Sequence, residues 1–501
     1  MAVMAPTLCS RCGDAVEGGC DPRDELAELD ALFERLKLKR YNLKRKINQF
    51  HSPIARQLPP DVTSTIFEFC LPDYADRPNQ FLQEDLSVPL SLGSICSYWR
   101  YIAWSTPSLW SSLVVRVGGS KHDPHIIAGV AQEWLARSGQ LPLSIRILAF
   151  YNETIAALAD IINRYSTRWS DLDLLIPPDC YQLFHAIDNH APTLKSIRFR
   201  GPPDSKSLNF QLTCPRLERA TLEKLTMNGF DIQWDNLTHL ILHSMSITDS
   251  FLILRKTPRL VFCKVLDTGH RRQNIGAHTP VLTSLRSLHL LTSYCEDFLN
   301  NIIAPRLEDL SLPDYYYNPS MDVITSFLRR SACSLRSFSM DFHSFLPHFE
   351  RGLIFLKSMN TLTKISITKD YDLWNILQLV AKVLSSQSTS LLQGFLPNLK
   401  ILEYTGMLRL PARNLEYLYA LLPSNNAVHG PLHLFKLDVH AMTRIPKKMM
   451  SYFSGLEERG VTVNVLSNSE DILQSSIDYY RRREESLCLD WADNLDSSLF
   501  S

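Results

Sequence analysis

The sequence predicts an α/β solenoid that follows a short all-α module. Three observations lead to this prediction. A short apolar pattern, L-x-x-L-x-L with conservative replacements, recurs between residues 169 and 439. A helix-forming segment without Gly or Pro covers residues 24–50. Between these regions, two short apolar patterns with helical spacing contain prolines at the places where helices begin.

Composition indicates an ordinary globular protein. Hydrophobic residues make up 45% and charged residues 21% of the 501 residues, and the formal net charge is zero. A neutral balance argues against nucleic acid or an anionic membrane as partner. No apolar run reaches the roughly 18 residues of a membrane span. We therefore expect a soluble intracellular protein, in the cytoplasm or the nucleus, and we expect most of its eleven cysteines to be small buried hydrophobes.

The N-terminal residues 1–22 are predicted to form a flexible tail. Cys9 and Cys12 form a CxxC pair, and Cys20 follows. A structural zinc site needs four ligands, and the segment does not supply a fourth. The sequence therefore predicts free thiols and no metal.

A coiled-coil-like helix is predicted over residues 23–51. Its apolar residues form two series with a spacing of seven, interleaved by steps of 3 and 4, as in the a and d positions of a coiled coil. The a series is Leu26, Phe33, Arg40 and Ile47, and the d series is Leu29, Leu36, Leu43 and Phe50. Acidic residues precede Arg35 and basic residues follow it. Two interpretations remain: antiparallel self-association through residues 24–50, or packing against the chain's own body.

A small helical module is predicted over residues 52–115. Its two motifs read LPPDVTSTIFEFCL and PLSLGSICSYWRYIAWSTPSLW. They resemble the F-box of fungal multigene families, with its leading Leu-Pro, its Ile/Phe helix, its Cys-x-x-Trp-Arg and its closing Pro-x-Leu-Trp. The resemblance implies docking on the Skp-type adaptor of a cullin-based ubiquitin ligase. The implied docking residues are Leu58, Pro59, Ile66, Phe67, Cys96, Trp99, Pro107, Leu109 and Trp110. The inserted segment 71–89 is longer than in common F-boxes. The alternative is a degenerate module that only caps the following repeats.

The repeats are predicted to form a solenoid over residues 116–470, followed by a C-terminal helix and tail over residues 471–501. The first apolar positions are Trp169, Leu194, Leu217, Leu237, Leu260, Leu285, Leu307, Leu335, Leu362, Leu399 and Leu434. The first nine lie 20 to 28 residues apart, and the last two follow after 37 and 35 residues. Pro192, Pro215, Pro258, Pro305 and Pro397 stand two residues before a first position, where we expect them to end the preceding helix.

This pattern resembles the leucine-rich-repeat family, which implies parallel strands alternating with helical returns. The family places Asn or Cys three residues after the third apolar position, and here Leu225, Met245 and Thr268 stand there. We therefore expect an irregular arc rather than a regular horseshoe.

The strand residues between the apolar positions are predicted to face outward and to bind a protein partner. The candidates are Arg198, Arg200, His239, His243 and His289, with Tyr315, Tyr316 and Tyr317 just beyond one strand. Walker, GxGxxG, GxSxG and HExxH motifs are absent from the sequence, so we expect no cofactor and no catalytic residue. The sequence predicts the substrate-recognition adaptor of an SCF-type (Skp-cullin-F-box) ubiquitin ligase with an unidentified protein substrate. The alternative is a scaffold outside such a ligase.

Overall fold

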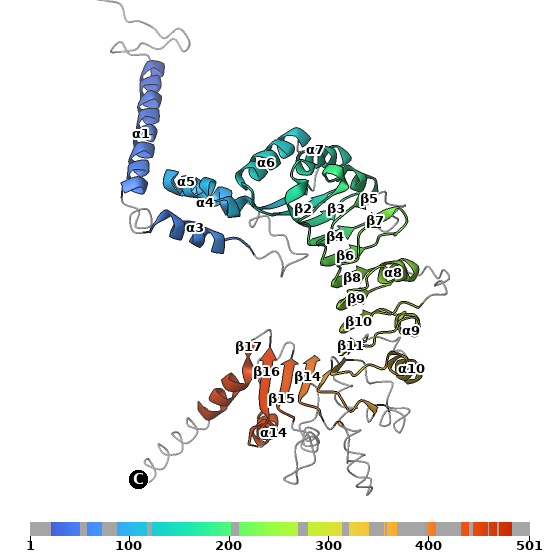
Figure 1. The fold of residues 1–501 in the computed structure, drawn as a ribbon. Coiled ribbons are helices and arrows are strands. Elements are labelled where there is room, and N and C mark those ends of the chain that lie inside the picture. Colours follow the sequence, from blue (N-terminus) through green and yellow to red (C-terminus); the bar gives the residue numbers. More distant parts are fainter. Residues whose placement is uncertain are drawn as a thin grey trace, which may run out of the picture. The chain divides into compact units, whose positions relative to one another are not determined.

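A computed structural model gives the fold of this protein (Figure 1). It describes residues 22–50, 58–72, 88–117, 123–201, 210–268, 279–312, 320–339, 358–367, 398–406, 432–439, 444–458, 460–467 and 470–482, with Phe355 and Leu396. The chain divides into two compact units. The first comprises Met1–Arg116 and Lys121–Arg146, and the second comprises Val117–Ser120 and Ile147–Ser501.

The first unit is mainly helical. Its helices are α1 (Pro22–Phe50), α3 (Pro60–Phe69), α4 (Val88–Ile95), α5 (Ser97–Ser105), the 3-10 turn η2 (Pro107–Trp110) and α6 (Pro124–Arg137). Strand β1 (Ser112–Val117) follows η2, and β2 (Leu143–Ala149) follows α6 and continues into the second unit. Prolines occupy the first turns of α3, η2 and α6, where no intrahelical N–H bond is lost.

The second unit is built on parallel strands. They are β3 (Trp169–Leu175), β4 (Ser196–Arg200), β6 (Arg219–Glu223), β8 (His239–His243), β9 (Phe262–Leu266), β10 (Ser287–Leu291), β11 (Asp309–Ser311), β12 (Ser337–Ser339), β13 (Lys364–Ile367), β14 (Ile401–Gly406), β15 (Leu434–Val439) and β16 (Thr462–Ser467). Each pairs in parallel with the next, and β17 (Glu470–Asp471) closes the order antiparallel to β16. The small strands β5 (Phe210–Leu212) and β7 (Phe230–Ile232) form a separate parallel pair.

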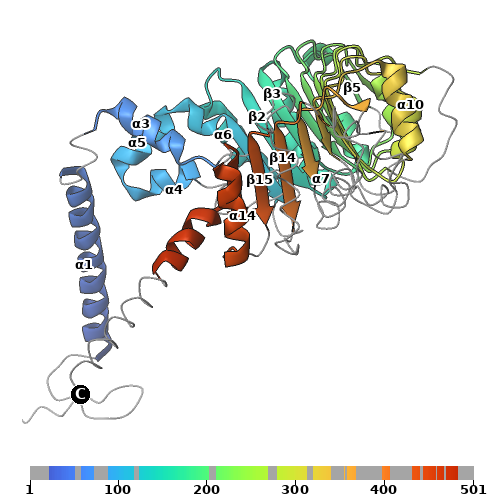
Figure 2. The ribbon, with the colours of Figure 1, turned by 90° about the horizontal axis from the view of Figure 1, so that it is seen from below.

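Helices connect some of these strands. They are α7 (Asn152–Asn163), α8 (Ile247–Leu254), α9 (Cys295–Asn300), α10 (Met321–Ser331) and α14 (Lys447–Glu457), with the 3-10 turns η3 (Ser166–Arg168), η4 (Pro178–Leu183) and η5 (Ile187–Asn189). Figure 1 shows α8, α9 and α10 one after another along the same side of the neighbouring strands. In Figure 2, β14 and β15 run side by side in the same direction. Within the described residues, one sheet has fifteen strands in chain order, apart from the paired β5 and β7. The fold is mixed α/β with a long, mostly parallel sheet, an arrangement compatible with an α/β solenoid.

The second apolar position of the repeat forms one continuous buried row. The strand register aligns these side chains across twelve strands, and none is more than 5% exposed. They are Leu172, Ile197, Ala220, Leu240, Cys263, Leu288, Leu310, Phe338, Ile365, Leu402, Phe435 and Val463. A single strand has no apolar neighbour for such a side chain, so successive strands must stack to bury it.

The alignment corrects the last predicted repeat. Leu434 was expected at the first apolar position, but it pairs with Ile401 on the other side of the strand. The buried pairs are Leu402 with Phe435 and Tyr404 with Leu437. The repeat therefore begins at Leu432, two residues earlier than predicted. Because the spacing of 3 and then 2 also fits the later apolar residues, the sequence alone does not separate the two registers.

The recurring prolines have a different role from the one expected. The backbone N–H of Leu194, Leu217 and Leu260 donates to the carbonyl three residues earlier, which closes a tight turn at the start of each strand. Pro192, Pro215 and Pro258 occupy the second residue of these turns, where a fixed φ near −65° is favoured. Leu237 makes the same turn bond without a proline. The proline thus shapes the entry into the strand. A helical element does precede Pro192 (η5) and Pro258 (α8). Strand β5 precedes Pro215, so our prediction that the proline follows a helix was wrong there.

The opposite strand ends share a left-handed residue. Lys224, Ser244 and Asp267 directly follow β6, β8 and β9, with φ of 54°, 52° and 44°. Each donates its backbone N–H to the last carbonyl of the following strand, at 2.9 to 3.1 Å. This bond ties each of these repeats to the next one.

Candidate functional site

The first candidate surface lies on α3, whose apolar residues divide between two sides of the helix. Phe67 is 1% exposed, and its ring centroid lies 4.9 Å from that of Trp99 in α5. Val62, Ile66 and Phe69 are 41%, 44% and 86% exposed. These three are spaced by four and three residues, so they share one helix face. Helix α3 therefore presents an apolar strip, defined as Val62, Ile66 and Phe69.

Further apolar side chains of the same unit are exposed on the neighbouring helices. Leu90 of α4 is 45% exposed, Ile95 of α4 is 53% exposed, and Tyr101 of α5 is 69% exposed. These residues and Phe69 are not among the docking residues that the F-box resemblance implies. A helical pattern shows which residues share a face, but it does not show which face the rest of the unit covers.

Three of the nine docking residues implied by the F-box resemblance are buried inside the unit. The indole of Trp110 is fully buried, donates to the Ala103 carbonyl at 2.7 Å, and stacks edge-on against Trp104 and Trp134. Leu109 is also buried, and Trp99 is half-buried. The Cys96 sulfur caps α5 by accepting from the Trp99 backbone N–H at 3.4 Å.

The remaining marker residues lie at or near the surface. Pro59 and Pro107 are exposed, and Leu58 is half-buried. Ile66 is the marker residue that also belongs to the apolar strip. The expected docking residues thus divide into an inner set that holds the helices together and an outer set available to a partner.

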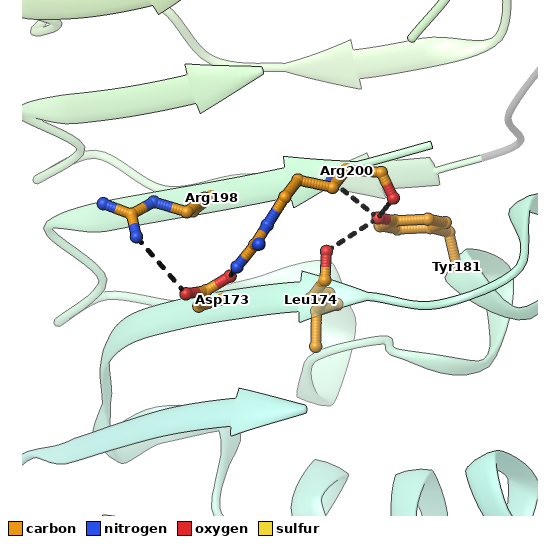
Figure 3. A network of polar contacts seen from close by, with 5 residues as sticks. All are labelled: Asp173, Leu174, Tyr181, Arg198 and Arg200. Carbon is orange, nitrogen blue, oxygen red and sulfur yellow. Dashed lines mark hydrogen bonds and ion pairs between the residues drawn. The ribbon is translucent and has the colours of Figure 1, made fainter. Parts of the chain in front are cut away.

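The second candidate surface is formed by outward strand residues in the second unit. At its first strands, Arg198 and Arg200 of β4 converge on Asp173 of β3 (Figure 3). Arg200 Nη2 lies 2.9 Å from Asp173 Oδ1, and Arg198 Nη1 lies 3.6 Å from Oδ2. The Asp173 and Arg200 side chains are only 10% and 12% exposed, so water screens this pair weakly. The cluster carries one net positive charge.

A buried tyrosine fixes the neighbouring strand ends. The hydroxyl of Tyr181 lies 2.9 Å from the carbonyl oxygens of Leu174 and Arg200, and it accepts from the Arg200 backbone N–H at 3.0 Å (Figure 3). Burial raises the pKa of Tyr181 well above its ordinary value, so the hydroxyl stays neutral. Tyr181 therefore positions the backbone that carries Arg200.

The histidine candidates lie farther along the same strand face. His243 of β8 lies between Glu223 and Asp267, with ring nitrogens 3.5 and 3.3 Å from their carboxylates. The His239 ring lies 5.8 Å from the Phe262 ring, whose other neighbour is the His289 ring at 5.3 Å. Imidazole and aromatic side chains thus alternate across β8, β9 and β10.

His289 also belongs to a polar cluster with β11. Its Nε2 lies 3.0 Å from Asp309 Oδ2, and the Ser287 hydroxyl donates to the same oxygen at 2.8 Å. Partial burial by itself would raise the pKa of Asp309. Hydrogen bonds from His289, Ser287 and Ser337 outweigh burial and lower this pKa below its ordinary value.

A third cluster surrounds Glu403 of β14. Lys364 Nζ lies 2.7 Å and Lys436 Nζ 3.7 Å from its carboxylate, and the Ser366 hydroxyl donates at 3.1 Å. Burial opposes ionisation, but the hydrogen bond and the charge of Lys364 outweigh it and lower the pKa of Glu403. Asp173, Asp309 and Glu403 were not among the predicted site residues. Their outward positions between core residues could have identified them, but the sequence does not show that cationic neighbours converge on them.

Several cysteines of the second unit are buried free thiols. Burial raises the pKa of the Cys214, Cys263 and Cys295 thiols to about 12, which disfavours a nucleophilic thiolate. In the described part of the chain, no three His, Cys, Asp or Glu residues come close enough to hold a metal ion. No helix there is long and apolar enough to cross a membrane. Tyr315, Tyr316, Tyr317, Cys9, Cys12 and Cys20 lie outside the described residues.

Neither a protein-family model nor a curated protein matches this chain.

Proposed function

We propose that the chain is the substrate-recognition adaptor of an SCF-type ubiquitin ligase. In this proposal the module of α3, α4, α5 and η2 is an F-box that docks on a Skp-type adaptor, which in turn joins the cullin scaffold. The observation that carries the proposal is the apolar strip on α3. Apolar side chains gathered on one helix face are expected to be covered by a partner, because their exposure to water is unfavourable.

The strand face of the second unit is the proposed site for the protein target, within a leucine-rich-repeat-like solenoid. Its charged residues occur in compact clusters of both signs, and aromatic rings lie between them. This mixture suits protein recognition better than the uniform positive charge that a phosphate backbone needs. The adaptor itself then needs no catalytic residue, because it holds the target near the ubiquitin that other subunits transfer.

The test measures binding of the purified full chain to a Skp-type adaptor by isothermal titration calorimetry. The double variant Ile66→Asp/Phe69→Asp places two carboxylates on the strip. We expect at least a hundredfold loss of affinity, because a charge without a partner is costly in an apolar interface. The matched control is Ile126→Asp/Val130→Asp, on α6, whose side chains are 66% and 55% exposed. The control should bind as the wild type does.

Binding that persists in the α3 variant would contradict the proposal. So would wild-type protein that does not bind the adaptor at micromolar concentration. The alternative function, a protein scaffold outside a ligase, would then be preferred. The inner residues Phe67, Leu109 and Trp110 fit that alternative equally well, because a cap also needs a packed core.

A further inference from the structure

We propose that α1 pairs with the α1 of a second copy of this chain in antiparallel orientation. The first observation is the exposure of the helix. All described side chains of α1, from Leu26 to Ile47, are exposed. The a and d residues Leu26, Leu29, Phe33, Leu36, Leu43 and Ile47 are between 52% and 59% exposed. Helices in proteins derive most of their stability from packing an apolar face, and the residues that the structure describes leave this face exposed from Leu26 to Ile47.

The charge distribution selects both the occupant and its direction. Between residues 26 and 47, the acidic side chains are Glu28, Asp30 and Glu34, and the basic ones are Arg35, Lys37, Lys39, Arg40, Lys44, Arg45 and Lys46. Two such helices in parallel place acid beside acid and base beside base. In antiparallel orientation the acidic half of each helix faces the basic half of its partner. The helix is therefore complementary to a reversed copy of itself, as a two-fold symmetric contact requires.

The heptad positions define the register. In an antiparallel coiled coil an a residue meets a d residue of the partner. Leu29 then meets Ile47, Phe33 meets Leu43, and Leu36 meets Arg40. The flanking e position places Asp30 beside Lys44 on both sides of the two-fold axis. Arg40 has only Leu36 opposite and extends its guanidinium to water along an aliphatic stem.

A parallel pair of the same helices would bring like charges together. Arg40 would meet its own copy at the buried a position, and Lys39 would lie beside Lys44 on both sides. Antiparallel pairing also has a cost, because Lys37 and Lys39 lie near their own copies at the two-fold axis. Those residues are exposed, so this repulsion is smaller than that of two arginines in the seam.

The first test is the mass of the full chain by sedimentation equilibrium over a range of concentrations. We expect a concentration-dependent rise from 57.3 kDa to twice that value. Leu36→Ala, at a d position, should weaken dimerisation at least tenfold. Leu38→Ala is the matched control, because Leu38 is 61% exposed but points away from the seam. A monomer at every concentration, or equal effects of the two variants, would overturn the proposal. The apolar face would then belong to another protein or to the chain's own body.

The second test is a charge swap that separates the two directions. In the antiparallel pair, Asp30→Lys and Lys44→Asp should each weaken dimerisation by roughly 2- to 30-fold, since each changes two exposed pairs. The double variant Asp30→Lys/Lys44→Asp should restore the wild-type constant. In a parallel pair Lys44→Asp would instead strengthen dimerisation by removing its contact with Lys39. That result would overturn the antiparallel arrangement while leaving self-association in place.

A distance measurement confirms the direction independently. A spin label attached through a non-natural amino acid at Ala27 lies eleven residues from the two-fold axis at position 38. Two such labels would be separated by about 33 Å along an antiparallel pair, at about 1.5 Å per residue. In a parallel pair they would face each other across the helices at about 10 to 20 Å, given an interaxial distance of about 10 Å. A distance distribution centred on the short value would contradict the proposal.

Discussion

The strand array and the α3–α5 module use apolar side chains in opposite ways. Along β8, Leu240 and Leu242 are fully buried, and the alternate residues His239, Ile241 and His243 face outward. On α3, Phe67 is buried while Phe69, two residues later, is 86% exposed. A strand in the array has the same buried side in every repeat, because the neighbouring strands continue it in register. The helix has only one packed side, and its apolar residues extend beyond that side.

This difference separates structural residues from candidate binding residues. In the array, an apolar residue at the second or third repeat position contributes to the core, and the candidate binding residues are the outward-facing ones beside them. In the module, apolar residues on the outer side of α3 form the candidate surface themselves. Replacing an apolar residue should therefore reduce stability in the array, whereas on the outer side of α3 it should reduce binding to a partner.

The largest expected effect comes from comparing Phe67 and Phe69 within α3. Phe67→Ala should reduce the free energy of unfolding of the module by about 3–5 kcal/mol, because it leaves a cavity against Trp99. Phe69→Ala should change stability by less than about 0.5 kcal/mol. Urea denaturation followed by tryptophan fluorescence measures both values. Adaptor affinity should fall for Phe69→Ala in spite of its unchanged stability, and similar stability losses for the two variants would refute the division of α3 into two faces.

The array offers a matching pair of neighbours in β8. Leu242→Ala should destabilise the second unit by about 2–5 kcal/mol, since Leu242 is fully buried between Leu222 of β6 and Val265 of β9, its partners in the strand register. Ile241→Ala, on the outward side, should cost less than about 1 kcal/mol. Thermal unfolding followed by circular dichroism compares the two variants. A greater loss for Ile241→Ala would place the core on the other side of the sheet.

A smaller effect is expected where charge, rather than apolar surface, is buried. Asp173→Asn removes the negative charge between Arg198 and Arg200, and we expect a loss of about 1–3 kcal/mol. The matched control is Asp171→Asn in the same strand, whose carboxylate lies 3.4 Å from Arg219 but is 39% exposed. An exposed pair contributes about 0–1 kcal/mol, and high salt reduces this further. Equal losses at 1 M NaCl would show that the Asp173 cluster is as exposed to solvent as the Asp171 pair.

The sequence predicted the strand array well because its signal is periodic. The spacing of 3 and then 2 assigned the core residues from Leu172 to Leu402, and the strand register aligns them as expected. The apolar spacing gave the wrong register where two registers fit it equally well, as at Leu434. It also failed where the first apolar position is missing: Gly460 stands there before β16, with φ of 84°, so Val463 and Val465 were not identified as a repeat.

The candidate surfaces were less predictable because they depend on three-dimensional packing. The F-box resemblance implied both Ile66 and Phe67 as docking residues, whereas the structure leaves Ile66 exposed and buries Phe67 against Trp99. The outward positions of Arg198 and Arg200 followed from strand alternation. Their convergence on Asp173 required the lateral order of β3 and β4, which a single sequence does not contain. The periodicity of an element thus predicts which of its residues share a side. It does not predict which residue of a neighbouring element each of them contacts.

The smallest expected effect is a pH dependence at Asp309. The pKa of this carboxyl is lower in the folded protein than its ordinary value of 3.8, so ionised Asp309 stabilises the fold. This contribution is complete above the unfolded pKa and is lost as pH falls through the lower, folded pKa. Asp309→Asn should therefore reduce Tm at pH 7 slightly and make the decline of Tm between pH 5 and about 3 less steep. Ser339→Ala, on neighbouring β12, has no titratable group and should keep the wild-type slope. If the slope of Tm against pH is unchanged in Asp309→Asn, the contacts of Asp309 with His289 and Ser287 add nothing to the stability of the fold. A partner could then bind the outward face near β10 and break these contacts without a cost in stability.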